Sequence, residues 1–143
     1  MTVEPLLFDS HTKLRAALGL VFASAAGYSP FVAGHIYSPQ EREPYDALSD
    51  RFLRAFDSSL KFFRTWERVR EADVSETFRD LLLRMEKIGL ISDLATWIAL
   101  RDLRNRVVHD YLPDELAALY AAIIREAVPE FQRLEAAITK RLQ

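Results

Sequence analysis

The sequence predicts an all-α fold, an up-and-down antiparallel bundle of about five helices formed by a single domain over residues 1–143. Half of the residues are hydrophobic, which is enough to bury a real core. Only 4 glycines and 6 prolines occur, and they gather in a few places. The long stretches between them are rich in Leu, Ala, Glu, Arg and Phe, as is typical of helices, and no segment has the alternation of a strand.

The first helix is expected from about Asp9 to about Ala26, with Asp9 or Ser10 as its cap and Gly27 as its end. An irregular loop over residues 27–43 follows, because helix-breaking residues recur there. Its apolar side chains indicate a loop that folds back onto the bundle or onto a partner, and a mobile linker is the alternative. These side chains are Phe31, Ile36 and Tyr37.

The second helix is expected to begin near Pro44, and one side of it carries a stripe of large apolar side chains. We interpret this stripe as core or as an interface between subunits. Its members are Tyr45, Leu48, Phe52, Phe56, Phe63 and Trp66. Another side of the same helix carries the basic residues Arg54, Lys61, Arg64 and Arg68. These residues form either a solvated face, balanced by Asp57, Glu67 and Glu71, or a ridge that holds RNA phosphates.

The third helix is expected from Glu76 to about Ile88, capped by the segment 73–75 and stopped by Gly89. Ser92 or Asp93 then caps the fourth helix, which we expect to end around Tyr111.

Pro113 fits the first turn of the last helix, where its missing N–H is not needed. Pro129 should bend that helix or break it in two.

The composition also limits the function. The formal net charge is −2, which argues against coating long nucleic acid but leaves room for a local basic cleft. No cysteine is present, so disulfides and thiolate metal sites are excluded. His11 and His35 have no cluster of possible ligands around them, and we expect both to be surface or packing residues. We expect no metal, no cofactor, no membrane association and a cytoplasmic location.

Residues 101–111, at the end of the fourth helix, carry three arginines, a histidine and a tyrosine. Helical geometry predicts Arg101, Arg104, Val108 and Tyr111 along one stripe, with His109 displaced from it. A histidine can move protons near neutral pH, and an arginine beside it can hold a phosphate by two hydrogen bonds. This set suits cleavage of RNA without a metal, in which the 2′-hydroxyl attacks its own phosphate.

The reaction needs both a base and an acid, whereas this segment supplies one histidine. A homodimer that joins two copies of the segment would supply both groups. The alternative is that Arg104 and His109 only cap the helix C-terminus, where cations are favoured.

The segment from Arg104 to His109 matches the R-x4-H pattern of HEPN domains, and Tyr111 extends it to R-x4-H-x-Y. In this form it resembles the HepT toxins of the HepT/MntA systems. The surrounding sequence is similar to the HepT-like and nucleotidyltransferase-substrate-binding branch from about Leu48 to the C-terminus. The likeness rests on Arg51-Phe52, Thr77–Asp80, Glu86–Ile91 and Trp97.

The resemblance implies a HEPN-like bundle that dimerises with the motifs facing each other across a cleft. It implies a metal-independent endoribonuclease that cuts tRNA or mRNA, with Arg104 and His109 as the catalytic pair. Asn105 would order the site, and Asp102 and Arg101 are auxiliary residues by position. It further implies a type VII toxin–antitoxin pair, in which an MntA-type nucleotidyltransferase antitoxin adds AMP to Tyr111.

Two other functions stay open. The same branch includes proteins described only as substrate-binding partners of nucleotidyltransferases, so a non-catalytic binding subunit is the second hypothesis. A plain structural bundle is the third, in which substitutions in the motif would change only stability.

Overall fold

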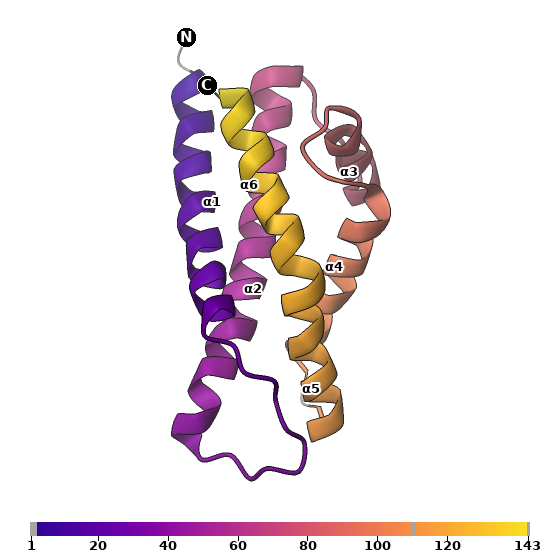
Figure 1. Ribbon diagram of the computed structural model, residues 1–143. Coiled ribbons are helices and arrows are strands. Elements are labelled where there is room, and N and C mark those ends of the chain that lie inside the picture. The colour runs from indigo at the N-terminus through magenta and orange to yellow at the C-terminus, as the bar shows by residue number, and fades with distance from the viewer. Residues whose placement is uncertain (1–2, 110, 143) are drawn as a thin grey trace.

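The computed structural model describes residues 3–109 and 111–142, and these form helices and connecting turns without a strand (Figure 1). The α-helices are α1 (Val3–Ala26), α2 (Pro39–Trp66), α3 (Phe78–Lys87), α4 (Leu94–Arg106), α5 (Pro113–Ala122) and α6 (Val128–Leu142). A π-helical segment, η1 (Glu67–Glu71), extends α2, and a second, η2 (Ile123–Ala127), joins α5 to α6. Within the described residues, these segments join into five helical rods, and the predicted all-α bundle is confirmed. Figure 1 shows that α1, α2, α4 and the rod of α5 and α6 alternate in direction. Within the described ranges, no helix is both long and apolar enough to cross a membrane.

The aromatic stripe of α2 forms the core, as predicted from its spacing. Trp97 of α4 is fully buried, and its ring centroid lies 5.7 Å from that of Phe56 and 5.1 Å from that of Phe63. Phe131 of α6 packs on the same indole at 6.1 Å. Each such side chain stabilises the fold by about 1.5–3 kcal/mol through burial alone. The core therefore holds α2, α4 and α6 in fixed relation.

The helix α1 begins at Val3, not at Asp9. Pro5 can lie in the first turn because the N–H groups there have no partner within the helix. Leu7 is fully buried, so the residues ahead of Asp9 contribute to the core. Glu4 also receives two hydrogen bonds from Arg70 of η1, at 3.0 and 3.1 Å, which hold this first turn against the end of α2.

The helix α2 begins at Pro39, so the prediction of a start near Pro44 was wrong, and the irregular loop spans residues 27–38 instead of 27–43. Ser38 and Glu41 form a capping box: the Glu41 N–H donates to Ser38 Oγ at 3.1 Å, and the Ser38 N–H donates to Glu41 Oε1 at 2.8 Å. The pattern S-x-x-E at residues 38–41 carries this signal in the sequence.

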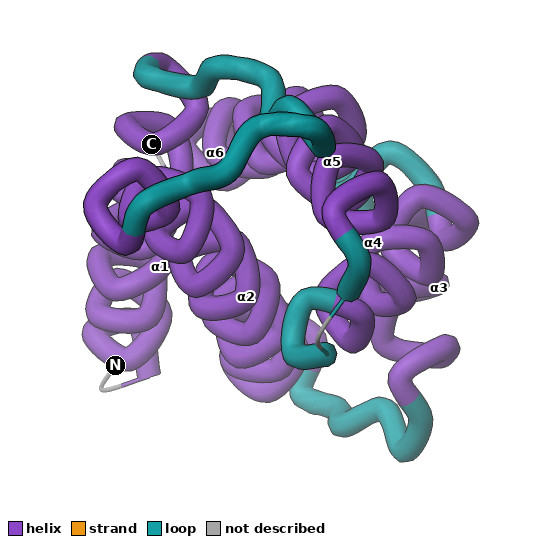
Figure 2. Tube along the Cα trace, turned by 90° about the horizontal axis from the view of Figure 1, so that it is seen from below, coloured by secondary structure: helices purple, strands orange, loops and turns teal. Residues whose placement is uncertain are grey.

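The loop over residues 27–38 folds back onto the bundle. Figure 2 shows it passing across the lower end, from α1 toward α5 and back to α2. Phe31 stacks on Tyr37 with ring centroids 4.5 Å apart and meets Tyr45 and Tyr120 edge-on at 5.1 and 5.3 Å. Ile36 is 92% exposed and takes no part in this packing.

The helix α3 begins at Phe78 with Thr77 as its cap, and the segment 73–75 does not cap it. The reason is that a buried carboxylate, Glu67, accepts the backbone N–H of Ser75 at 3.0 Å. The chain is therefore held close to η1 for two more residues before the helix starts.

The helix α4 is capped by Asp93, whose carboxylate accepts the N–H of Thr96 at 2.7 Å, as expected. It ends at Arg106, however, and not around Tyr111.

The last rod begins with Pro113 in its first turn, as predicted. Pro129 was expected to bend this helix or break it in two, and a π-helical segment interrupts the α-helical hydrogen bonding just ahead of it. The N–H of Val128 reaches the carbonyl of Ile123, one residue further back than in an α-helix. This π-helical segment adjoins the point where proline cannot donate a hydrogen bond.

Candidate active site at the end of the fourth helix

Arg104 of α4 is held by Asp57 of α2 in a two-point contact. Its Nε donates to Asp57 Oδ1 at 3.0 Å, and its Nη2 donates to Asp57 Oδ2 at 2.9 Å. The side chains are 28% and 38% exposed, so the pair lies at the surface with one side open to solvent. The hydrogen bonds to Asp57 raise the pKa of the Arg104 guanidinium above its ordinary value, which keeps it charged.

The contact with Asp57 leaves part of the guanidinium available. Arginine has five N–H donors, and the pair uses the Nε–H and one N–H of Nη2. The other three donors remain in a fixed plane, where an anion such as a phosphate could accept two of them. Asp57 therefore orients Arg104 without occupying all of its hydrogen-bond donors.

Arg104 is not a helix cap. Both of its hydrogen bonds go to a carboxylate on another helix, not to carbonyls at the end of α4. The capping alternative is thereby wrong for this residue.

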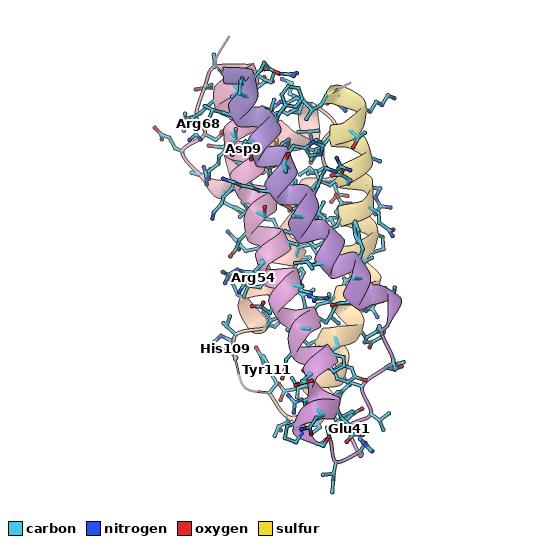
Figure 3. The ribbon with its side chains drawn as sticks, turned by 90° about the vertical axis from the view of Figure 1, so that its left-hand side faces the viewer. Asp9, Glu41, Arg54, Arg68, His109 and Tyr111 are labelled. Carbon is cyan, nitrogen blue, oxygen red and sulfur yellow. The ribbon has the colours of Figure 1, made fainter. Side chains whose placement is uncertain are left out.

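His109 lies beyond the end of α4, in the turn that leads to α5. Its backbone N–H donates to the carbonyl of Arg106 at 3.1 Å, which closes this turn. The imidazole is exposed and makes no side-chain hydrogen bond to another described residue. Its ring meets that of Tyr111 edge-on, with centroids 6.1 Å apart and planes at 88°. Figure 3 shows His109 and Tyr111 beside the outer face of α2, below Arg54.

Tyr111 is half-buried at a small pocket of about 190 Å³. Arg106 of α4 and Glu115 of α5 line the same pocket. The tyrosine thus lies within a recess that presents one cation and one carboxylate.

The auxiliary residues do not gather around Arg104. Arg101 lies over the ring of Phe78 on α3, with its guanidinium carbon 4.3 Å from the ring centroid. Asp102 and Asn105 are exposed, and within the described ranges neither makes a side-chain hydrogen bond. The predicted stripe of residues 101, 104, 108 and 111 is also wrong, because the helix ends before its last two members.

Sequence reasoning missed the role of Asp57, which was expected only to balance the charge of nearby basic residues. An acid that interrupts the basic side of α2, between Arg54 and Lys61, was the available signal. Glu67 does not balance that side either, because it is buried and binds Ser75 and Arg84.

The other two histidines are a packing residue and a surface residue, as expected. His11 is buried against Phe62 and lies 3.2 Å from Glu135, and His35 lies 3.1 Å from Glu41. Across residues 3–109 and 111–142, no three His, Asp or Glu side chains come together as a possible metal site.

Comparison with known proteins identifies the family to which the chain belongs. The model of the family described as "Nucleotidyltransferase substrate binding protein like" matches residues 32–140. The chain therefore belongs to this family, and its predicted place in the HepT-like branch of the HEPN superfamily is confirmed.

Among individual proteins, the chain is similar to one named "Probable ribonuclease HepT" from Haemophilus influenzae (strain ATCC 51907 / DSM 11121 / KW20 / Rd). The two are 41% identical over 80 residues, which is 51% of this chain and 53% of the relative. The chain thus spans about half the length of the curated relative it matches. No solved structure matches the chain.

Proposed function

We propose that the protein is a metal-independent endoribonuclease whose catalytic pair is Arg104 and His109. The observation that carries the proposal is that Asp57 holds the guanidinium of Arg104 in place while three of its N–H donors stay free to bind a phosphate. The exposed imidazole of His109 follows shortly afterwards in the chain. The likeness to a protein named as a probable ribonuclease supports it.

In the proposed reaction, His109 accepts the proton of a ribose 2′-hydroxyl, and the 2′-oxygen attacks the adjacent phosphorus. The bond from phosphorus to the 5′-oxygen breaks, which leaves a 2′,3′-cyclic phosphate and a 5′-hydroxyl. The open donors of Arg104 neutralise the charge that grows on the phosphoryl oxygens. The substrate is an RNA, either tRNA or mRNA.

The proton for the 5′-oxygen comes from a second imidazole, and a homodimer supplies it. His109 is the single histidine of its segment, whereas the reaction needs a base and an acid at once. Two exposed apolar side chains, Val108 and Leu112, flank His109 and Tyr111. Their burial against a second copy would bring two motifs together.

The protein acts in this proposal as the toxin of a type VII toxin–antitoxin pair. A nucleotidyltransferase antitoxin of the MntA type transfers AMP from ATP to the Tyr111 hydroxyl: the tyrosine oxygen bonds to the α-phosphorus, and pyrophosphate leaves. The adduct would cover the recess beside Arg106 and obstruct the approach of RNA. Arg106 offers a cation for the phosphate of the adduct.

The test is RNA cleavage in excess EDTA, with protein whose intact mass shows that Tyr111 carries no AMP. We expect the wild type to cut RNA and His109→Ala to cut it at least 100-fold more slowly, since proton transfer contributes about 10²–10⁴. His35→Ala is the matched control, because it removes an exposed histidine that lies outside the motif, in the loop over residues 27–38. Equal rates for wild type and His109→Ala would refute the assignment.

A second function is a binding subunit for a nucleotidyltransferase, which the description of the matching family favours. It predicts a stable complex with the nucleotidyltransferase and no cleavage by the unmodified protein. An inactive wild type in the assay above, tried on both tRNA and mRNA, would favour this function.

A further inference from the structure

A groove of about 590 Å³ runs between α1 and the upper part of α2. Four cationic side chains and one carboxylate line it, although the whole chain has more acidic than basic residues. The cations are Lys13, Lys61, Arg64 and Arg68, and the carboxylate is Asp9. The groove is thus a local positive site on a negatively charged protein.

Three of these cations are not neutralised by the protein. Lys61, Arg64 and Arg68 are exposed, and none forms an ion pair with another described residue. Lys13 differs, because it lies 3.3 Å from Asp9 on the same helix. Like charges that repel one another without a counter-charge cost stability, and an anion bound in the groove would offset this repulsion.

The shape of the groove is fixed by contacts on both sides. The pair of Glu4 and Arg70 ties the start of α1 to η1 at one end. Further along, buried His11 of α1 packs against Phe62 of α2. The walls therefore do not need to move for a ligand to enter.

The groove is aligned with the candidate active site. Asp57, Lys61, Arg64 and Arg68 follow one another at spacings of four, three and four residues, which places them on one side of the same helix. At 1.5 Å per residue, the cations extend to roughly 16 Å from the contact between Asp57 and Arg104. In Figure 3, Arg68, Arg54 and His109 are found along one edge of the molecule.

We propose that this groove binds the phosphate backbone of single-stranded RNA and guides the strand toward Arg104 and His109. The inference rests on the proposed function and extends it to a substrate-binding surface. Lys61, Arg64 and Arg68 lie in a single file, with steps of about 5 and 6 Å, and so follow one strand better than a duplex. The hydroxyl group of Ser10 lines the same groove and can donate to a phosphate oxygen, whereas that of Thr65 already donates to the carbonyl of Lys61 at 3.1 Å.

The side chains that line the groove also indicate that it does not recognise bases. No aromatic side chain lines the groove, so bases have nothing to stack on. Binding in the groove should therefore depend on charge and hardly on base sequence. Specificity for a cleavage position would have to arise elsewhere.

The experiment measures the affinity of the full chain for a single-stranded RNA that has 2′-O-methyl groups and so cannot be cleaved. The test variant is Lys61→Gln, Arg64→Gln and Arg68→Gln combined. The control combines Arg79→Gln, Lys87→Gln and Arg125→Gln, which removes the same charge from exposed sites outside the groove. A third variant, Lys61→Arg with Arg64→Lys and Arg68→Lys, keeps the charge of the groove.

We expect the groove variant to bind at least 10-fold more weakly and the other two within about 2-fold of the wild type. The slope of log affinity against log salt should fall by about 2, as for three lost contacts to single-stranded RNA. Uridine-rich and adenine-rich strands should bind alike. Equal weakening in the groove and control variants, or no RNA binding by the wild type, would overturn the proposal.

Two outcomes separate this inference from the proposed function. A groove variant that binds and cleaves like the wild type refutes the groove and leaves the ribonuclease intact. Weaker binding by the groove variant, with a wild type that never cleaves, supports the groove and refutes the ribonuclease. A groove variant that keeps RNA affinity but no longer binds a nucleotidyltransferase would assign the surface to a protein partner and overturn the proposal.

Discussion

A surface ion pair such as that of Arg104 and Asp57 contributes little to stability, about 0–1 kcal/mol, because water screens half-exposed charges. Its effect on geometry is larger. A free arginine side chain has about 2 kcal/mol of rotamer entropy to lose when it binds an anion. Two hydrogen bonds to Asp57 fix the guanidinium before any substrate arrives. Asp57 is therefore a positioning residue for Arg104.

Substitution Asp57→Asn tests this role at the scale of one residue. The amide keeps one acceptor but cannot receive both N–H groups, so Arg104 is no longer held in one plane. We expect kcat for RNA cleavage to fall by about 10–100-fold while KM changes less than 3-fold, since orientation acts on the transition state. The midpoint of thermal unfolding should move by only a few degrees.

The control for this substitution is Asp50→Asn on the same side of α2. Asp50 also pairs with an arginine, Arg54, at 2.9 Å, and both side chains are exposed. The control removes the same charge without touching Arg104, and we expect unchanged kinetics. Equal losses in both variants would show that only the overall charge matters.

At the scale of elements, a buried carboxylate joins three parts of the chain. Glu130 of α6 is fully buried and accepts hydrogen bonds from four donors. Ser92 donates its N–H at 3.0 Å and its hydroxyl at 2.7 Å, Trp97 of α4 its Nε1–H at 2.8 Å, and Arg133 its Nε–H at 3.2 Å. These hydrogen bonds fix the start of α4, which is the helix that carries Arg104.

Substitution Glu130→Ala should lower the free energy of unfolding by about 3 kcal/mol or more, because the buried indole N–H of Trp97 loses its acceptor and two donors of Ser92 lose theirs. Urea denaturation followed by far-UV circular dichroism would measure it. Glu126→Ala is the comparison, since Glu126 is exposed one turn earlier and should cost no more than about 0.5 kcal/mol. If Glu130→Ala lowered the free energy of unfolding by less than about 1 kcal/mol, the hydrogen bonds of Glu130 would not be what holds the start of α4 in place.

The elements also indicate which parts of the fold can be predicted from sequence. Helices with a clear apolar face, such as α2 with its aromatic stripe, follow from periodicity. Their ends were less predictable, because α2 starts at the capping box of Ser38 and α3 starts late when Glu67 binds Ser75. The capping box is a local pattern and could have been predicted from the sequence, whereas the late start of α3 depends on a contact between two elements.

At the scale of the whole molecule, the candidate site likewise could be predicted only where its residues are close in the sequence. Arg104, His109 and Tyr111 were identifiable because they lie in one short segment. Asp57 was not, because 47 positions separate it from Arg104 and only the packing of α4 on α2 joins them. The groove between α1 and α2 likewise combines residues from distant parts of the chain, and the sequence predicted only its α2 side.

The assembly of two copies is the property of the whole molecule on which the proposed chemistry depends, and Leu112 offers a way to test it. Leu112 is 71% exposed beside the motif and precedes α5 as its N-cap, where it makes no side-chain cap hydrogen bond. Aspartate is a favoured N-cap, so Leu112→Asp should not weaken the helix, yet it places a charge in the proposed interface. We expect this variant to sediment as a monomer and to lose cleavage by at least 100-fold. Ile36→Asp introduces the same charge at an exposed apolar site outside the motif, on the loop over residues 27–38, and should stay dimeric and active. If Leu112→Asp were monomeric and still cut RNA at the wild-type rate, one copy of the motif would suffice, and the second proton-transfer group would have to come from within the same chain.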